Sequence, residues 1–413
     1  MNTSTNLSQF LQWSGKMPLA EAAVEYLSID CRDTPAIARV TRFCGAGGTM
    51  EYHITVRLTA PVPEADAVCH LTRAYQYALA AVDVSVSSAV FRRIFCSDVV
   101  NQAHLVKHPV LGIPATGGCA VSLVGQPPLP AKKFSLWAYH ICDPPADLKK
   151  SFENGTVSLR RGGLTHHWTA GLTDCVAVGP YEQTRRVMED YDAWLRAKSM
   201  TMATNVVRTW WFMQNVDADY QGLVEARRDF FSSHGLTTAS HYIASTGIEG
   251  AHPAVAARVS LDSYAISGLQ EDQVTYLAAP EHLCPTHDYG VTFERATSVA
   301  FADRKHVYVS GTASIDHTGR MLFEGDVVRQ LDRTLENIEA LLKNVSANLG
   351  DLAMIIVYLR DPADGAAVDA ALNEKMGTIP YVLVQAPVCR PVWLIEIEGI
   401  AIVPASLPKF PHF

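Results

Sequence analysis

One pattern of strands and helices recurs three times along the chain, and this repetition is the strongest constraint on its fold. The last copy is the clearest. A β-branched run over 306–315 is followed by the turn residues Asp316–Gly319, which predicts a strand pair. Apolar residues at helical spacing predict a helix over 326–342. The remaining expected elements complete the order ββαβαββ: a strand over 354–359, a helix over 366–375, and strands over 380–384 and 393–402.

The middle and the first part of the chain repeat this order. The middle copy is expected to have strands over 175–179, 206–212 and 255–266 and helices over 182–195 and 223–231. The first copy is looser, with strands over 51–58, 88–95, 119–124 and 134–141 and helices over 65–81 and 101–108. We therefore expect an α+β fold of three tandem ββαβαβ units, which form a pseudo-trimer with the sheets inside and the helices outside.

Turn-rich stretches at Cys142–Pro145 and 268–287 mark the expected boundaries between the units. They divide the 413 residues into an N-terminal extension over 1–39, a first unit over 40–149, a second unit with its linker over 150–286, a third unit over 287–403 and a tail over 404–413. Since one chain would close the ring by itself, a monomer or a small homo-oligomer is expected.

Composition excludes several classes of protein. Hydrophobic residues make up 48% and charged residues 18%, which is typical of a packed globular chain. The net charge of -8 offers no general basic surface, so no nucleic-acid partner is expected. No signal segment or long apolar run occurs, which favours a cytoplasmic protein without a membrane partner. The nine cysteines lack a C-x-x-C pair and no phosphate-binding glycine motif occurs, so neither a metal nor a cofactor is expected.

Two glutamates stand out in the last strand. Glu396 and Glu398 are two positions apart among Leu, Ile and Gly, so both side chains point to the same face. A carboxyl group in such apolar surroundings has a raised pKa, which suits proton transfer. The other copies carry Ser135 and Ser260 at the position of Glu396, so this carboxyl is particular to the third unit. For Glu398, an ion pair between units remains an equal alternative.

Further side chains could contribute to a binding site, with arginines to hold a carboxylate and Tyr220 to orient the substrate. Arg390 follows Cys389 on a turn before the last strand, where a guanidinium can make two parallel hydrogen bonds to a carboxylate. A surface salt bridge is the alternative. Tyr220 and Arg227 are seven residues apart, about two helical turns, and therefore lie on one face of a helix. A solvated arginine is the alternative there. Cys389 itself can simply shape the pocket.

The segment 386–401 combines Cys389-Arg390 with a strand that reads Glu-Ile-Glu-Gly-Ile-Ala, and it resembles the signature of the Rid superfamily, the YjgF or reactive-intermediate deaminase fold. Simple members of that family are homotrimers with sites between subunits. The resemblance therefore implies that three tandem units build a pseudo-trimer with a site between units.

The second and third units, over about 160–403, resemble more narrowly the chorismatases of this fold. The likeness is carried by the Tyr220 to Arg227 spacing, by Phe293–Ala296, by Ser-Gly-Thr-Ala-Ser at 310–314 and by the seven-residue step from Cys389 to Glu396. It departs at Trp211–Asn215, where the family has an Asn-Tyr-Leu-Pro-like segment, and at Ala279, where the family has a second substrate-binding Tyr; Tyr276 is the nearest replacement.

This resemblance implies roles for individual residues. Glu396 would be the catalytic acid and base, and Cys389 would accompany hydroxybenzoate formation. The substrate would be bound by Tyr220, Arg227, Arg295, Arg390, Cys389 and Ala313.

The function expected is therefore a cofactor-independent lyase or hydrolase of secondary metabolism that acts on a small anionic carboxylate. It would cleave chorismate to pyruvate and a hydroxybenzoate or a dihydroxycyclohexadiene carboxylate, at the interface of units two and three. Two alternatives stay open: a Rid-type imine or enamine deaminase, and a non-catalytic binder of small acids.

Overall fold

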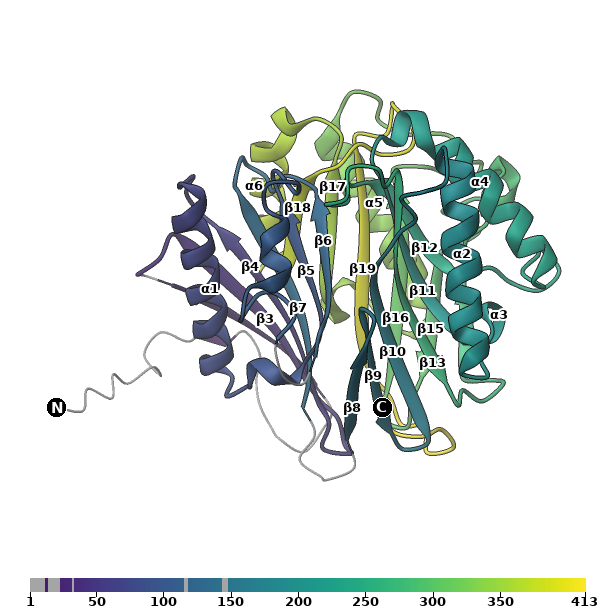
Figure 1. Cartoon of the computed structure of the whole chain (residues 1–413), viewed down its shortest axis with the longest axis horizontal. Helices are drawn as coiled ribbons and strands as arrows, with labels where there is room; N and C mark the ends of the chain where they lie inside the picture. The colour runs from purple at the N-terminus through teal and green to yellow at the C-terminus, as the bar shows by residue number, and fades with distance from the viewer. Residues whose placement is uncertain (1–11, 14–22, 32, 115–117, 143–147) are drawn as a thin grey trace.

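The computed structural model describes residues 12–13, 23–31, 33–114, 118–142 and 148–413. Three mixed sheets stand side by side, and the long helices cover their outer faces (Figure 1). This arrangement confirms the expected α+β fold of three tandem units. Of the expected first linker, all residues after Cys142 lie outside the described part of the chain.

The first sheet has the order β1-β2-β3-β4-β7-β5-β6. Its strands are β1 (Gln12–Trp13), β2 (Ala23–Asp30), β3 (Ala36–Cys44), β4 (Met50–Leu58), β5 (Ala89–Cys96), β6 (Ala120–Gly125) and β7 (Phe134–Cys142). The helical segments of this unit are α1 (Glu64–Ala81), η2 (Val86–Ser88) and η3 (Ala103–Lys107).

The second sheet has the order β12-β11-β13-β10-β9-β8. Its strands are β8 (Lys149–Glu153), β9 (Thr156–Arg161), β10 (Leu164–Leu172), β11 (Val206–Met213), β12 (Ala244–Glu249) and β13 (Val259–Ser267). The helices of this unit are α2 (Pro180–Ala197), α3 (Met202–Asn205) and α4 (Val216–Ser233).

The third sheet has the order β14-β15-β16-β19-β17-β18. Its strands are β14 (Val274–Leu277), β15 (Ala296–Ala300), β16 (Arg304–Ala313), β17 (Leu352–Leu359), β18 (Tyr381–Gln385) and β19 (Ile395–Pro404). Its helical segments are η4 (Thr286–Tyr289), α5 (Val327–Leu342), η5 (Lys343–Val345), η6 (Leu349–Asp351), η7 (Pro362–Asp364) and α6 (Gly365–Met376).

The three sheets share one six-strand order, in which β2-β3-β4-β7-β5-β6, β8-β9-β10-β13-β11-β12 and β14-β15-β16-β19-β17-β18 correspond. Each ends in a parallel pair, β5 with β6, β11 with β12 and β17 with β18. The edge strand of each unit contacts the next unit, β6 against β10, β12 against β16 and β18 against β4. The ring of three units is therefore closed within one chain.

Two expected elements of the middle and first copies are wrong. Residues 175–179 form no strand but an exposed bend, in which Val176 and Val178 are 87% and 90% exposed. The short Val-Ala-Val run has the composition of a strand, but the strands that precede α2 in the second sheet are β9 and β10. The helix expected over 101–108 is reduced to the 3₁₀ segment η3.

The strand expected over 255–266 begins only at Val259, and β12 was not expected because Ala, Ser, Thr and Gly dominate it. The unit boundaries also shift. The first sheet includes β2 and part of β3, which lie in the expected extension 1–39. The third sheet begins with β14, inside the stretch 150–286 that was assigned to the second unit.

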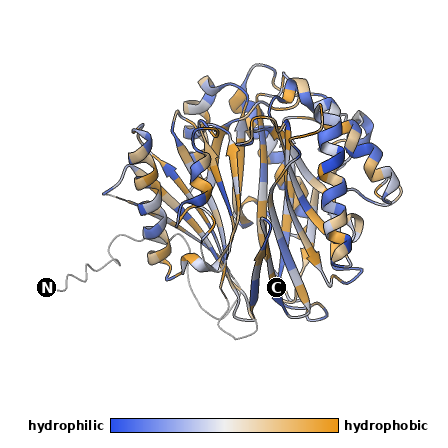
Figure 2. Cartoon of the chain, in the orientation of Figure 1, coloured by the Kyte–Doolittle hydropathy of each residue, from blue (hydrophilic) through white to orange (hydrophobic). Residues whose placement is uncertain are grey.

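The helices pack one apolar face on the sheets. In α5, the buried positions include Leu331, Leu335 and Ile338, which recur at helical spacing, and Asp326 caps the first turn by accepting a hydrogen bond from the Arg329 amide. Figure 2 shows the result as alternating hydrophobic and hydrophilic colour along the outer helices. None of the described helices is long and apolar enough to cross a membrane.

The three sheets meet around a buried arginine. Arg93 of β5 is fully buried, and its guanidinium lies 2.8 Å from Asp262 of the second unit and 3.7 Å from Glu398 of the third. It also lies over the rings of Trp137 and Trp210, at 5.5 and 5.0 Å from their centroids. One cation therefore contacts all three units at the centre of the molecule.

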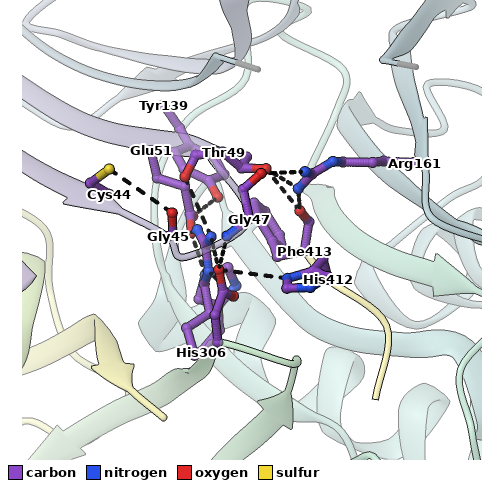
Figure 3. Close-up of polar contacts among 12 residues, drawn as sticks. Cys44, Gly45, Gly47, Thr49, Glu51, Tyr139, Arg161, His306, His412 and Phe413 are labelled. Atoms are coloured by element: carbon purple, nitrogen blue, oxygen red, sulfur yellow. Dashed lines mark hydrogen bonds and ion pairs between the residues drawn. The ribbon is translucent and has the colours of Figure 1, made fainter. Parts of the chain in front are cut away.

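A second buried network joins the first and third units (Figure 3). The Glu51 carboxylate of β4 accepts hydrogen bonds from Tyr139 and Arg304, and His306 Nε2 lies 2.9 Å from its Oε1. Burial raises the pKa of Glu51, but His306 and Arg304 outweigh that effect and hold it well below its usual range. Arg304 is held in turn by Asp303, 2.9 Å away.

Candidate active site

A pocket lies at the interface of the second and third units. Its walls come from α4 and β12 of the second unit and from β16, β19 and the preceding turns of the third. The lining residues are Tyr220, Arg227, Ser245, Thr246, Gly247, Phe293, Arg295, Gly311, Ala313, Ile315, Cys389, Arg390, Trp393 and Glu396. All seven residues expected from the sequence are in this set.

The second unit contributes a helix and a strand. α4 begins after Asn215, whose side chain accepts a hydrogen bond from the Ala218 amide, and it presents Tyr220 and Arg227 to the pocket. β12 lies parallel to β11 and is fixed against the third unit, since the Ser245 amide donates to Ser310 Oγ over 2.9 Å. The two halves of the pocket are thereby held in register.

Glu396 projects into the pocket from β19 and is 4% exposed. Opposite it, β16 shifts register between Val309 and Thr312, and Gly311 lies in that irregular step. A Cβ atom at position 311 would collide with Glu396 Oε1, so a larger residue there would displace the carboxyl group from its present position. Burial and the neighbouring Glu398 raise the pKa of Glu396 to about 8, although Arg208 and Arg295 oppose the rise. Glu396 is therefore mostly protonated at neutral pH.

Glu398 has very different surroundings. Arg208 Nη2 donates to its Oε2 over 2.6 Å, Trp210 Nε1 donates to its Oε1 over 2.8 Å, and Thr246 also donates to Oε2. Arg208 and Trp210 belong to the second unit, so the alternative of an ion pair between units is confirmed for Glu398. Thr246 also accepts from the Gly311 amide over 3.0 Å, which links this ion pair to the wall beside Glu396.

Three guanidinium groups face the pocket. Arg227 is buried and donates from Nε to Thr292 Oγ1 over 3.1 Å and from Nη1 to Ser245 Oγ over 3.4 Å. Arg295 is also buried and donates from Nη2 to the Cys284 carbonyl over 2.8 Å. Arg390 is exposed at the rim, 5.7 Å from the centroid of the Trp393 ring. The pocket is positively charged around a neutral acid.

Cys389 lines the same pocket as these groups. Burial raises the pKa of its thiol to about 12, an effect to which Glu396 adds and which a hydrogen bond with Tyr220 partly offsets. The thiol is therefore neutral at physiological pH. It contacts the pocket as a small apolar group beside the Tyr220 hydroxyl.

Several residues of the site were not expected from the sequence. Ser245, Thr246 and Gly247 belong to β12, a strand whose composition did not mark it. Phe293, Ile315 and Trp393 add an apolar wall. Arg208, which supports Glu398, is a lone arginine in the apolar strand β11, and that anomaly is the signal by which it could have been found.

The arrangement can bind a small anion with an apolar body and can give it a proton. No described part of the chain brings three or more His, Cys, Asp or Glu side chains together in a way that could hold a metal ion.

The comparisons with known proteins agree with this geometry. The family model described as endoribonuclease L-PSP matches residues 295–403. The 3-aminoacrylate deaminase RutC of Acinetobacter baylyi is 33% identical over 98 residues, which cover 23% of this chain and 77% of that protein. The 3-hydroxybenzoate synthase of Streptomyces hygroscopicus is 37% identical over 105 residues, 23% of this chain and 30% of that protein.

A solved chorismatase structure extends the likeness beyond the third unit. It has a TM-score of 0.60 at 18% identity and covers 76% of this chain and 93% of that chain. At this identity the likeness concerns the fold, and its coverage is larger than any one of the three units. By its relatives, its family model and its tandem architecture, the chain belongs to the Rid superfamily and has a chorismatase-like fold.

Proposed function

We propose that this protein is an enzyme that cleaves the enol ether of chorismate, or of a close relative, and releases pyruvate. One observation carries the proposal: Glu396 is a buried acid with a pKa of about 8, in a pocket that Arg227, Arg295 and Arg390 line. A neutral carboxylic acid at pH 7 can donate a proton, and the arginines favour an anionic substrate beside it.

The lining favours a ring with more than one carboxylate. Three arginines exceed what a single carboxylate needs, because one guanidinium can already bind a carboxylate through two hydrogen bonds. Phe293, Trp393 and Ile315 supply apolar surface for a ring. Chorismate has a ring carboxylate, a second carboxylate on its enolpyruvyl group and an apolar cyclohexadiene between them.

The proposed reaction begins with proton transfer from Glu396 to the terminal methylene carbon of the enolpyruvyl group. The double-bond electrons form the new C–H bond, and the positive charge that develops on the adjacent carbon is shared with the ether oxygen. Water adds to that carbon and returns a proton to Glu396. The hemiketal then collapses: its hydroxyl loses a proton, the bond between the pyruvyl carbon and the ether oxygen breaks, and that oxygen takes up a proton, so that pyruvate and a ring alcohol leave.

Pyruvate release from chorismate tests this proposal. Chorismate is mixed with the full chain, and pyruvate is followed with lactate dehydrogenase and NADH. The proposal expects enzyme-dependent pyruvate formation that the Glu396→Gln variant lacks. Chromatography of the ring product then separates a hydroxybenzoate from a dihydroxycyclohexadiene carboxylate. An unchanged chorismate concentration after prolonged incubation would eliminate chorismate as the substrate.

A second candidate function rests on the likeness to 3-aminoacrylate deaminase RutC. An imine or enamine deaminase also needs an arginine that binds the substrate carboxylate and a carboxyl group that transfers protons to and from the attacking water. Here 2-iminopropanoate is generated in situ from alanine by an amino acid oxidase, and ammonia release is followed. Acceleration of ammonia release without pyruvate formation from chorismate would favour this function. Absence of both activities, with binding of chorismate, would favour a binder of small acids.

A further inference from the structure

The interface between the third and first units holds a cluster of charged and polar side chains that the proposed reaction does not use. Arg57 Nη1 donates to Asp369 Oδ1 over 2.6 Å, and the Tyr381 hydroxyl donates to the same oxygen over 2.7 Å. Arg39 is 7% exposed and donates from Nη2 to Asn373 Oδ1 over 2.6 Å. Both guanidinium groups lie over the Tyr381 ring, at 4.7 Å for Arg39 and 4.0 Å for Arg57.

Strand register shows that this cluster occupies the place of the candidate active site. Ser260 of the second unit lies opposite Phe212, and Glu396 of the third lies opposite Tyr358. Three residues before Phe212 is Thr209, opposite Ser245, which lines the pocket. Three residues before Tyr358 is Ile355, opposite Tyr381. Tyr381 is therefore the counterpart of Ser245.

The same register assigns Arg57 and Arg39 to positions of the candidate active site. Ala313 of the pocket lies opposite Glu396, and Arg57 lies opposite Ser135, the counterpart of Glu396 in the first unit. Arg39 lies opposite Thr55, which lies opposite Trp137, two residues after Ser135. In the third unit, the Arg295 carbonyl accepts a hydrogen bond from the Ser310 amide. Ser310 lies in the irregular step of β16, and this step is opposite Glu398, which is two residues after Glu396. Arg39 is therefore the counterpart of Arg295.

The helix completes the correspondence. α4 connects β11 to β12 and presents Arg227 to the pocket, and α6 connects β17 to β18 in the same position and presents Asp369. At the interface between the first and second units, the described residues place Gly155 at the position of Arg295, since its carbonyl accepts from the Ala170 amide. Among the described residues, an arginine at the position of Arg295 thus occurs at two of the three corresponding interfaces, and at one of these two a carboxylate of the chain itself pairs with Arg57.

We propose that the interface between the third and first units is a second carboxylate-binding site, built like the candidate active site, and that the Asp369 side chain occupies it as an internal ligand. Its ligand class is a small monocarboxylate, since the Asp369 carboxyl group accepts one charge-assisted hydrogen bond from Arg57 and one hydrogen bond from Tyr381. This inference concerns binding alone and does not depend on the proposed reaction.

Two observations make the site receptive to an external ion once Asp369 is shortened. The Nε of Arg39 is buried and has no hydrogen-bond partner among the described residues, so this cation has a donor still to satisfy. The side chains of Asp369 and Arg57 are 25% and 13% exposed, so the site is open to small solutes. Formate has nearly the same atoms as the carboxyl group that the Asp369→Ala change removes.

The test compares formate binding by the full-length protein and its Asp369→Ala variant. Binding is measured by calorimetry, and the melting temperature is measured in sodium formate and in sodium chloride at equal ionic strength. The variant is expected to melt lower than the parent in chloride, to recover part of the loss in formate, and to bind formate at least about tenfold more tightly than the parent does. An equal formate response of the two proteins would overturn the proposal.

Asp217→Ala is the matched control. Asp217 also pairs with an arginine of another unit, Arg360, at 2.6 Å. Its side chain is 53% exposed, however, and neither Tyr381 nor Arg39 takes part in this pair. Its variant should therefore respond to formate as the parent does. In the double variant Asp369→Ala/Arg57→Gln the formate effect should disappear, and its persistence would contradict the assigned site. If Asp369→Ala does not fold, Asp369→Ser, which also leaves room for formate, decides by the same comparison.

Discussion

Glu396 and Glu398 lie on the same face of β19, two residues apart, but their surroundings are opposite. Glu398 is paired with Arg208 and receives further hydrogen bonds from Trp210 and Thr246. Glu396 faces the pocket, and burial raises its pKa, an effect to which the charge of Glu398 adds. Burial and the neighbouring carboxylate together favour the protonated form of Glu396, and this difference between the two glutamates underlies the proposed proton transfer.

The activity should decline in alkaline solution. With a pKa of about 8, Glu396 is mostly protonated at pH 7 and loses its proton as the pH rises through 8. As the acid of the reaction, it should give a kcat/KM that falls about tenfold per pH unit above that value. Steady-state rates between pH 6 and 10 measure this. A rate that increases throughout the range would assign Glu396 the role of a base.

Replacement of Glu396 by Gln should stabilise the protein near neutral pH. The folded-state pKa of about 8 lies above the ordinary value of 4.5, so the contribution of the carboxyl to stability is complete below pH 4.5 and is lost as the pH rises through 8. Gln has no proton to lose, and the variant should gain stability relative to the parent across this interval. Urea unfolding at pH 5, 7 and 8.5 checks the trend, and a stability difference independent of pH would contradict it.

Arg227→Lys should weaken substrate binding, because lysine keeps the charge but loses the fork that holds Thr292 and Ser245 and presents a planar face to a carboxylate. We expect KM to rise about tenfold. Arg228→Lys is the matched control, since Arg228 is adjacent on α4 but exposed and close to Asp229. Equal KM values for the two variants would remove Arg227 from the binding site.

Glu51→Gln should destabilise the whole chain. The change leaves Arg304 and His306 beside a neutral group in a buried network, and removal of one partner of such a network costs about 3–5 kcal/mol. Glu25→Gln, which disturbs the partly exposed ion pair with Arg42, should cost about 0–1 kcal/mol. Urea unfolding at pH 7 compares the two variants. Similar losses of unfolding free energy would show that the Glu51 network does not stabilise the contact between the first and third units.

The threefold order of the fold could be predicted because most of its elements have clear patterns. The helix expected over 326–342 is α5, and the strand expected over 354–359 is the core of β17. β12 escaped prediction because its stability comes from neighbours on both sides, β11 and the third unit, and not from its own residues. Val176 and Val178 led to the opposite error. Valine favours strands, but these two side chains lie exposed in a loop and pair with no neighbouring strand.

Much of the candidate site was within reach of the sequence. Glu396 is a charge in an apolar strand, and Tyr220 and Arg227 share a helix face, so both signals are local. Ser245 and Thr246 reach the pocket only because two units pack together, and no local pattern reports that contact. The pairing of Glu398 with Arg208 also needed the structure, since 190 residues separate the two side chains.

Pyruvate release from chorismate by the parent protein and by Glu396→Gln, measured side by side, tests the central claim most directly. The parent should release pyruvate, and the variant should be slower by about 10²–10⁴-fold with little change in chorismate binding. Ser260→Ala and Ser135→Ala, at the corresponding positions of the other units, should retain nearly full activity. Near-normal pyruvate release by Glu396→Gln would contradict the assignment of Glu396 as the proton donor.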